Sequence, residues 1–217
     1  FCSAQFSDLS PGADRGIDAL LRNALIVLAF SGAGATWSLD ARRKTGRFAP
    51  DATIRAWPRY LLIGQLVLLY FLAGIYKQSA AWSAIGGYSA LFVVMHKPHF
   101  VRFEVPHDVL VAAYPLLQVS TLATLVFECS APLLPFAIWL RGRYRLMRVF
   151  LTTWIATGVF FHLALAIFFE LGIFPWGCLA LYPALIDPQS VRAASLRLEL
   201  PWWRESDYRA ASNSLND

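Results

Sequence analysis

The chain has 217 residues, of which 57% are hydrophobic, 15% aromatic and only 15% charged. Soluble domains usually contain about a quarter charged residues, so this composition excludes an ordinary water-soluble protein. The formal net charge is +5, but the arginines fall in short segments between apolar runs, where membrane proteins carry them for orientation. We therefore expect the lipid bilayer as the environment and no nucleic acid as a partner.

The first apolar run, residues 17–36, is predicted to be a membrane segment. Asp18 and Arg22 lie four residues apart near its start, a spacing at which a helix pairs opposite charges on one face. The two side chains form either an internal pair that holds helices together or part of the wall of a polar pocket.

The second membrane segment, residues 59–77, contains an uninterrupted apolar run from Tyr60 to Tyr76, in which Gln65 is the only strongly polar side chain. At about 1.5 Å per residue, this run covers roughly 25 Å of a hydrocarbon core about 30 Å thick, so it can cross as a helix. Lys77 closes the run. Its ammonium either extends to the membrane surface or belongs to a buried site.

The connection from Gln78 to Asp108 is long enough to hold interfacial or re-entrant structure. It contains the sequence HKPH, in which His96 and His99 have a spacing that a metal site on a helix can use. Pro98 argues against a helix there, and no cysteine or carboxylate motif completes a ligand set. We therefore expect no metal.

The third apolar run, residues 109–140, has 32 residues, with Glu128 as its only charge. As one straight helix it would reach about 50 Å, so we predict a break after Glu128, where Pro132 and Pro135 follow. A carboxylate in apolar surroundings needs a cationic partner or stays protonated. Glu128 is therefore either an anchor for a neighbouring Arg or Lys or part of a reactive site.

Two more segments complete the predicted bundle. Residues 149–171 carry His162, which is either a neutral hydrogen-bond donor between helices or a site residue. Residues 173–186 contain Pro175 and Pro183 and are short enough to be re-entrant instead of spanning.

These runs predict an all-α integral membrane protein with a bundle of about five transmembrane or re-entrant helices, over residues 1–187. Residues 188–217 are predicted to be an interfacial or partly disordered tail. A short strand is expected at 196–200, where leucines alternate with charged residues, and Trp202 and Trp203 suit a membrane interface.

Arginines and lysines crowd the first and third connections, which an up-and-down chain places on the same side of the membrane. Both are predicted to be cytoplasmic, and the expected location is a bacterial inner membrane, crossed several times. With this orientation most of the ionisable groups inside the membrane lie in its outer half, and such groups normally face a protein interior or water. We therefore predict a polar pocket that opens outward, formed near Lys77, His162, Glu128, Asp18 and Arg22.

Several motifs in the same order resemble a known family. They are YFLAGIYK (70–77) with Trp82 and GGYS (86–89), FH (161–162) with LGIFPW (171–176), WSLD (37–40), and FE (127–128). The pattern is similar to the HTTM domain family and to the related vitamin K-dependent gamma-glutamyl carboxylase, from Asp18 to about Asp187.

The resemblance implies a function for Lys77, which occupies the place of the lysine taken in the carboxylase as the base that deprotonates reduced vitamin K. A lysine in an apolar pocket can be a neutral amine near neutral pH, so this role is physically reasonable. An active protein of this kind would be a carboxylase-like lyase that uses a reduced, vitamin K-like quinone and acts on a peptide substrate. The residues expected at such a site are Lys77, His162 and Glu128 for catalysis, and Asp18, Arg22, Tyr76, Trp82 and Tyr88 for the pocket.

A second hypothesis is a non-catalytic subunit or scaffold that packs against other membrane subunits. It is motivated by the short fifth segment and by an aromatic content of 8 Trp and 16 Phe, which is more than a lipid interface requires.

Overall fold

The structure is a computed structural model that describes residues 16–36, 38–46, 50 and 52–191. Over these residues the secondary structure is helical, with one isolated backbone bridge and no named strand, so the predicted all-α fold class is confirmed. The described residues divide into two compact units, one of 16–21 with 62–185 and one of 22–61 with 186–191.

Three stretches are long and apolar enough to cross a membrane: α4 (Trp57–Ile75), the stretch Tyr114–Leu140 that contains α7 (Tyr114–Cys129) and α8 (Leu134–Leu140), and α9 (Arg145–Phe168). Less than half of each stretch is buried inside the protein. A helix that is apolar on its outward face as well as its inward face is typical of a membrane span. The chain is therefore a membrane protein, with three candidate spans among the described residues.

The predicted break after Glu128 is confirmed. Helix α7 ends at Cys129, a 3-10 turn, η4 (Ala131–Leu133), follows, and α8 begins at Leu134. Both η4 and α8 have a proline in their first two positions. A proline there costs little, because the backbone N–H groups of the first turn have no hydrogen-bond acceptor within the helix, and proline lacks only this N–H group.

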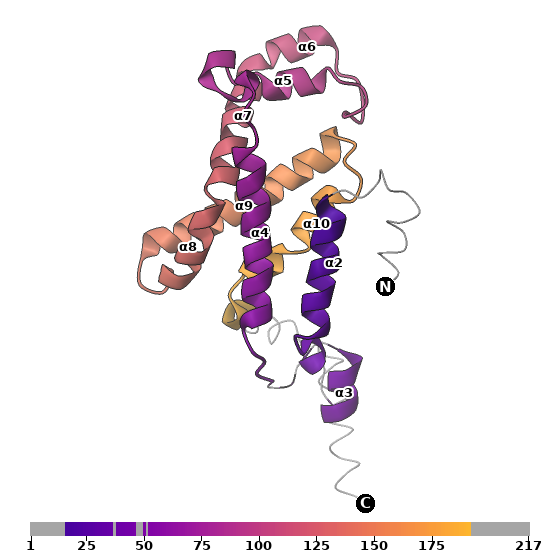
Figure 1. Cartoon of the computed structure of the whole chain (residues 1–217), viewed down its shortest axis with the longest axis vertical. Helices are drawn as coiled ribbons and strands as arrows, with labels where there is room; N and C mark the ends of the chain where they lie inside the picture. The colour runs from indigo at the N-terminus through magenta and orange to yellow at the C-terminus, as the bar shows by residue number, and fades with distance from the viewer. Residues whose placement is uncertain (1–15, 37, 47–49, 51, 192–217) are drawn as a thin grey trace, which may run out of the picture. The chain divides into compact units, whose positions relative to one another are not determined.

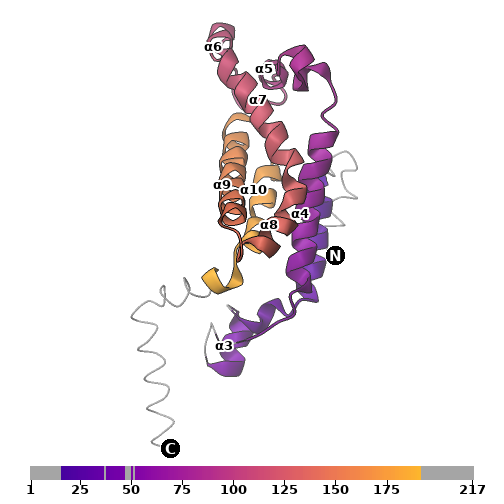
Figure 2. The ribbon, with the colours of Figure 1, turned by 90° about the vertical axis from the view of Figure 1, so that its left-hand side faces the viewer.

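Within the first unit, α8 and α10 (Phe174–Leu179) each pack against α9, and α5 (Ala90–Met95) lies beside α7 (Figure 1). Figure 2 shows the same neighbours from the side. The start of α2 (Gly16–Ala29) approaches α10 closely, since a Cβ added to Gly177 would lie 2.7 Å from Cγ1 of Ile17.

The connection between α4 and α7 is structured, as predicted. It contains two 3-10 turns, η2 (Ala80–Trp82) and η3 (Ala84–Gly86), followed by α5 and α6 (His107–Ala112). Met95, Val101, Leu110 and Phe169 form a small apolar core beneath it. Two backbone hydrogen bonds, from Arg102 N to Phe168 O at 3.0 Å and from Glu170 N to Phe100 O at 2.9 Å, fasten this connection to the end of α9.

The predicted first membrane segment, 17–36, is wrong at its end. Helix α2 stops at Ala29 after 14 residues, which is shorter than the about 20 residues that a span needs. The Ser31 hydroxyl donates to Leu28 O at 2.7 Å, and Gly32 adopts a left-handed φ of 73°, which ends the helix. The chain continues in η1 (Ala33–Ala35) and α3 (Leu39–Thr45).

The predicted fifth segment is a short α10 followed by the 3-10 turn η5 (Tyr182–Leu185), and within the described residues neither this segment nor α2 reaches spanning length. The count of about five transmembrane or re-entrant helices is thus not confirmed. The strand expected at 196–200, Trp202, Trp203 and Trp37 of the WSLD motif lie outside the described residues.

Candidate functional site

Lys77 follows the last turn of α4 and directs its amine toward α7. Its Nζ lies 2.5 Å from Oε2 of Glu128 and also donates to the carbonyl oxygen of Ala73 at 3.1 Å. The Glu128 side chain is only 5% exposed, while that of Lys77 is 20% exposed. Lys77 therefore pairs with a buried carboxylate instead of extending to the membrane surface.

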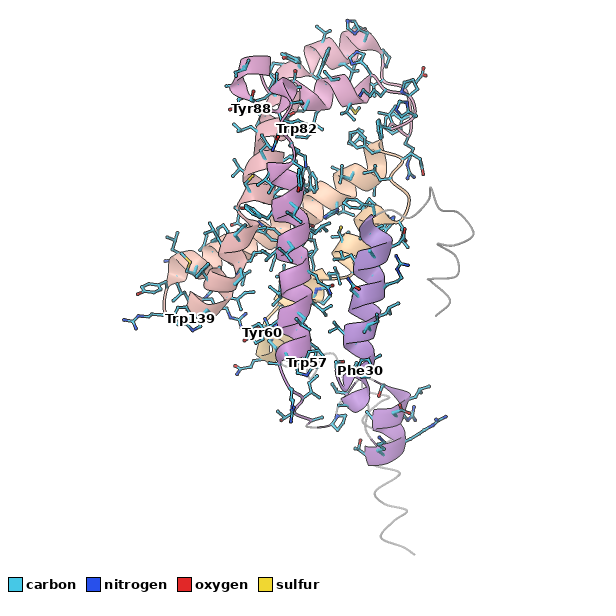
Figure 3. All side chains as sticks on the ribbon, in the orientation of Figure 1. Phe30, Trp57, Tyr60, Trp82, Tyr88 and Trp139 are labelled. Atoms are coloured by element: carbon cyan, nitrogen blue, oxygen red, sulfur yellow. The ribbon has the colours of Figure 1, made fainter. Side chains whose placement is uncertain are left out.

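The indole of Trp82 covers the same amine, with the ring centroid 5.1 Å from Lys77 Nζ. Figure 3 shows Trp82 where the chain leaves α4. A cation over an aromatic face is attracted by the ring quadrupole. An ammonium group has three N–H donors, and Glu128, Ala73 and the Trp82 ring account for three directions of interaction.

Gly74 explains how α4 and α7 come close enough for this ion pair. A Cβ added to Gly74 would lie 2.8 Å from Sγ of Cys129 and 3.2 Å from Cβ of Glu128. Only a residue without a side chain fits at that distance. The glycine of the AG motif thus brings the backbone before Lys77 against the residue that pairs with it.

A second polar cluster lies two turns earlier on α4. The hydroxyl of Tyr70 bonds with Nε2 of His162 on α9 and with the hydroxyl of Tyr182 in η5, the latter at 2.7 Å. All three residues are buried. Tyr70 precedes Lys77 by seven residues, so the two polar groups lie along the same face of the chain, about 10 Å apart in height.

Aromatic rings connect the two clusters. Phe127, the residue before Glu128, contacts Tyr70 edge to face, with ring centroids 5.0 Å apart, and stacks on Trp154 with centroids 4.5 Å apart. The Trp154 indole donates to the carbonyl oxygen of Phe127 at 3.2 Å. Gly158 leaves room beside them, because a Cβ there would collide with the Tyr182 hydroxyl.

Two buried polar atoms have no hydrogen-bond partner within the part of the chain that the structure describes. They are Nδ1 of His162 and Oε1 of Gln65. Buried polar atoms in folded proteins are nearly always paired, either with protein or with ordered water. Both atoms are closed to solvent and are left unsatisfied by the described residues that surround them.

The other predicted pocket residues are Asp18, Arg22, Tyr76 and Tyr88. Asp18 and Arg22 are half-buried and one turn apart on α2. Tyr76 is 75% exposed, so its side chain points away from the interior. Tyr88 is half-buried and has a φ of 52°, in the same connection as Trp82 (Figure 3).

The loop histidines form a different pair from the one that the HKPH spacing suggested. Nε2 of His96 lies 3.0 Å from Nδ1 of His107, and His96 bonds through Nδ1 to the carbonyl oxygen of Phe92 at 2.7 Å. Over the described ranges, no group of three or more His, Cys, Asp or Glu side chains is placed to hold a metal ion.

The sequence interpretation missed Tyr70 and Tyr182. Tyr70 is the first residue of the YFLAGIYK motif, and its helical spacing from Lys77 was the available signal. Tyr182 is a polar group in a short apolar segment, and only the fold shows that this segment returns to α4. The structure thus brings Lys77 and Glu128 together and places His162 in the neighbouring cluster.

Comparison with known proteins gives a family assignment. No curated protein and no solved structure matches the chain. The family model of the HTTM domain matches residues 20–189, which include α4, α7, α9 and all the residues of both polar clusters. Because the match covers well over half of its length, the chain belongs to the HTTM domain family.

Proposed function

We propose that the chain is a membrane-embedded domain of the carboxylase type, in which Lys77 and Glu128 bind the polar head of a reduced quinone or a related lipid and transfer its proton. The observation that carries this proposal is the ion pair itself, in which Nζ of Lys77 lies 2.5 Å from Oε2 of Glu128. The Glu128 side chain is buried, while one-fifth of the Lys77 side chain is exposed. Ionisable groups inside a membrane are costly, and their retention usually marks a functional site.

The residues present fit a quinone. Lys77 offers a polar group at the end of an apolar span, and the flat indole of Trp82 beside it suits a planar ring. The unpartnered Nδ1 of His162 offers a further contact for a polar ligand atom. A bound reduced quinone would supply the oxidisable ring from which carboxylase-type chemistry starts.

The protein's own part is proton transfer. The carboxylate of Glu128 lies within hydrogen-bond distance of the ammonium of Lys77, so it can accept a proton and leave a neutral amine. In water the charged pair would be strongly preferred, but the apolar surroundings reduce that preference because both charges lose their hydration. The neutral amine then acts as the base, and Glu128 stores the proton.

The test uses the full chain reconstituted in lipid vesicles, with two readouts: binding of a reduced quinone, and quinone-dependent incorporation of carbon dioxide into a glutamate peptide. Lys77→Met should abolish incorporation in a protein that is less stable but still folded. The matched control is Lys97→Met, since Lys97 is exposed in the loop after α5. Unchanged turnover in Lys77→Met would remove this lysine from the mechanism, and absence of quinone binding by the unaltered protein would overturn the proposal.

A second candidate function is a non-catalytic subunit of a larger membrane complex. The observation that favours it is the surroundings of the Lys77 ammonium, which donates to Glu128 and to the Ala73 carbonyl oxygen and lies over the Trp82 ring. In that case the pair only holds α4 to α7. Purification of the chain in a stoichiometric complex, with no quinone bound, favours the subunit, whereas a lone chain with a bound quinone supports the enzyme.

The placement in the membrane is also part of this proposal. We place the chain in a bacterial inner membrane with the connection between α4 and α7 outward, because arginines crowd the loop between α8 and α9. A cysteine introduced at exposed Lys97 should react with an impermeant thiol reagent in intact spheroplasts, and one at Arg143 should not. The reverse pattern would invert the topology.

A further inference from the structure

A hollow of about 390 Å³ opens on the surface at the end of α9, and one of its lining residues, Phe174, has its ring centroid 6.0 Å from that of His162. The lining residues of the hollow are His99, Phe100, Glu170, Leu171 and Phe174. Phe168, the last residue of the candidate span α9, comes two residues before Glu170. The hollow therefore lies at the level where a span ends and the lipid headgroups begin.

The frame of the hollow is rigid on two sides. The backbone hydrogen bonds between residues 100–102 and residues 168–170 hold the loop and the end of α9 in a fixed register. The buried side chains of Val101 and Phe169 lie in the apolar core beneath. The walls are thus present before any ligand binds.

Glu170, which lines the hollow, pairs with the neighbouring Arg102. Nη2 of Arg102 lies 3.4 Å from Oε2 of Glu170, and both side chains are about half exposed, at 49% and 60%. An ion pair of this kind contributes little to stability, so either group can exchange its partner for a ligand at small cost. The imidazole of His99 adds a hydrogen-bonding group among the lining residues.

Exposed apolar side chains precede and follow the lining residues Glu170 and Leu171 in the sequence. Ile167 and Phe168 at the end of α9 are 57% and 40% exposed, and Ile173 before α10 is 55% exposed. A ligand held at the ion pair by its polar group has room for hydrocarbon chains along these residues. The combination of a cationic group, an anionic group and adjacent exposed apolar side chains matches a membrane phospholipid with a zwitterionic headgroup.

We propose that this hollow binds the headgroup of a phosphoethanolamine-type phospholipid, with its ammonium at Glu170 and its phosphate at Arg102. Phe100 and Phe174 line the hollow, and aromatic rings attract an ammonium group placed over their faces. The guanidinium suits the phosphate because it donates two parallel hydrogen bonds. A lipid whose headgroup lacks an ammonium satisfies only half of this site. The site is independent of the pair at Lys77, and its occupant is a structural lipid, not the ligand of the proposed reaction.

The experiment measures which lipids stay with the purified full chain after incubation with an equal mixture of phosphatidylethanolamine and phosphatidylglycerol, by native mass spectrometry. The unaltered protein should retain phosphatidylethanolamine in excess. Glu170→Gln should reduce that excess about tenfold, the change expected for one charge-assisted hydrogen bond, and leave phosphatidylglycerol unchanged. Arg102→Gln should reduce both lipids, because both carry the phosphate.

Glu104→Gln and Lys97→Gln are the matched controls, since both residues are exposed on the same connection and neither lines the hollow. Leu171→Trp, which fills the hollow without changing its charge, should reduce retention of both lipids. Equal retention of the two lipids by the unaltered protein, or a preference that survives Glu170→Gln, would overturn the proposal. Thermal unfolding of each variant in detergent separates loss of the site from loss of the fold.

Discussion

The amine of Lys77 and the carboxylate of Glu128 are 51 residues apart in the sequence and 2.5 Å apart in the structure. Their pairing joins the end of α4 to the end of α7 within apolar surroundings. Each charge makes the other tolerable, because an ion that leaves water without a partner costs several kcal/mol. The stability of the protein and any chemistry at this site therefore depend on the same contact.

Removing one partner should destabilise the protein more than removing both. Glu128→Gln leaves the ammonium of Lys77 without its counter-charge and is expected to cost about 3 kcal/mol. The double variant Glu128→Leu with Lys77→Met has no charge left to bury and should be more stable than Glu128→Gln. The measurement is thermal unfolding in detergent, followed by circular dichroism.

The single variant Lys77→Met tests whether the ion pair contributes to the stability of the protein. Lys77→Met should cost more than about 1 kcal/mol if the buried carboxylate of Glu128 needs its partner. A Lys77→Met protein as stable as the original would mean that the pair contributes nothing to packing of α4 on α7.

Gly74→Ala should separate α4 from α7. The new methyl group would lie 2.8 Å from Sγ of Cys129 and 3.2 Å from its backbone nitrogen, so one helix must move, at a cost of about 1–3 kcal/mol. Gly64→Ala on the same helix is the matched control, because nothing lies within 4 Å of its added Cβ. The control should be neutral or gain up to about 1 kcal/mol in helix propensity. Equal effects of the two substitutions on the melting temperature would contradict the close approach at Gly74.

The helices that sequence predicted best are those with an unambiguous local signal. The apolar run ending at Lys77 became α4, and the excess length of the third run together with Pro132 and Pro135 placed the break between α7 and α8. The first segment was predicted to continue to residue 36 because small, uncharged residues such as Ser31 and Gly32 do not interrupt an apolar run. The Ser31 hydroxyl bond to Leu28 O and the left-handed backbone at Gly32 end the helix.

The sequence could predict which types of residue belong to the candidate site, but it could not predict which residues contact one another. Because Glu128 has no cationic neighbour in the sequence, its apolar surroundings predicted a cationic partner from another part of the chain. That partner is Lys77, which follows α4. The hydrogen bond between Tyr70 and Tyr182 joins residues 112 positions apart. Neither hydroxyl has a sequence neighbour that indicates its partner, so periodicity carries no information about the pair.

Tyr70 should be the more sensitive of the two tyrosines. Tyr70→Phe removes the bonds to both His162 and Tyr182 and leaves two buried polar groups without a partner, each worth about 1–3 kcal/mol. Tyr182→Phe removes only the bond to Tyr70 and should cost about 1 kcal/mol. In the double variant the losses should not add, because both single changes break the same bond. Additive losses in thermal unfolding would show that the two hydroxyls do not interact.

The two described cysteines should differ sharply in reactivity, and this difference tests the packing of α10. Cys178 on α10 is fully buried, while Cys129 is exposed. In a Cys2→Ser background, a membrane-permeant maleimide should therefore label the folded protein once, at Cys129, and should reach Cys178 only after denaturation. Peptide mass spectrometry assigns the label.

The matched variant for this labelling experiment is Gly177→Val, next to Cys178 on α10. A Cβ at position 177 would lie 2.7 Å from Cγ1 of Ile17, so the valine should loosen α10 enough to expose Cys178 before global unfolding. Rapid labelling of Cys178 in the unaltered, folded protein would mean that α10 opens on its own, and the contact of Tyr182 with Tyr70 would then be only transient.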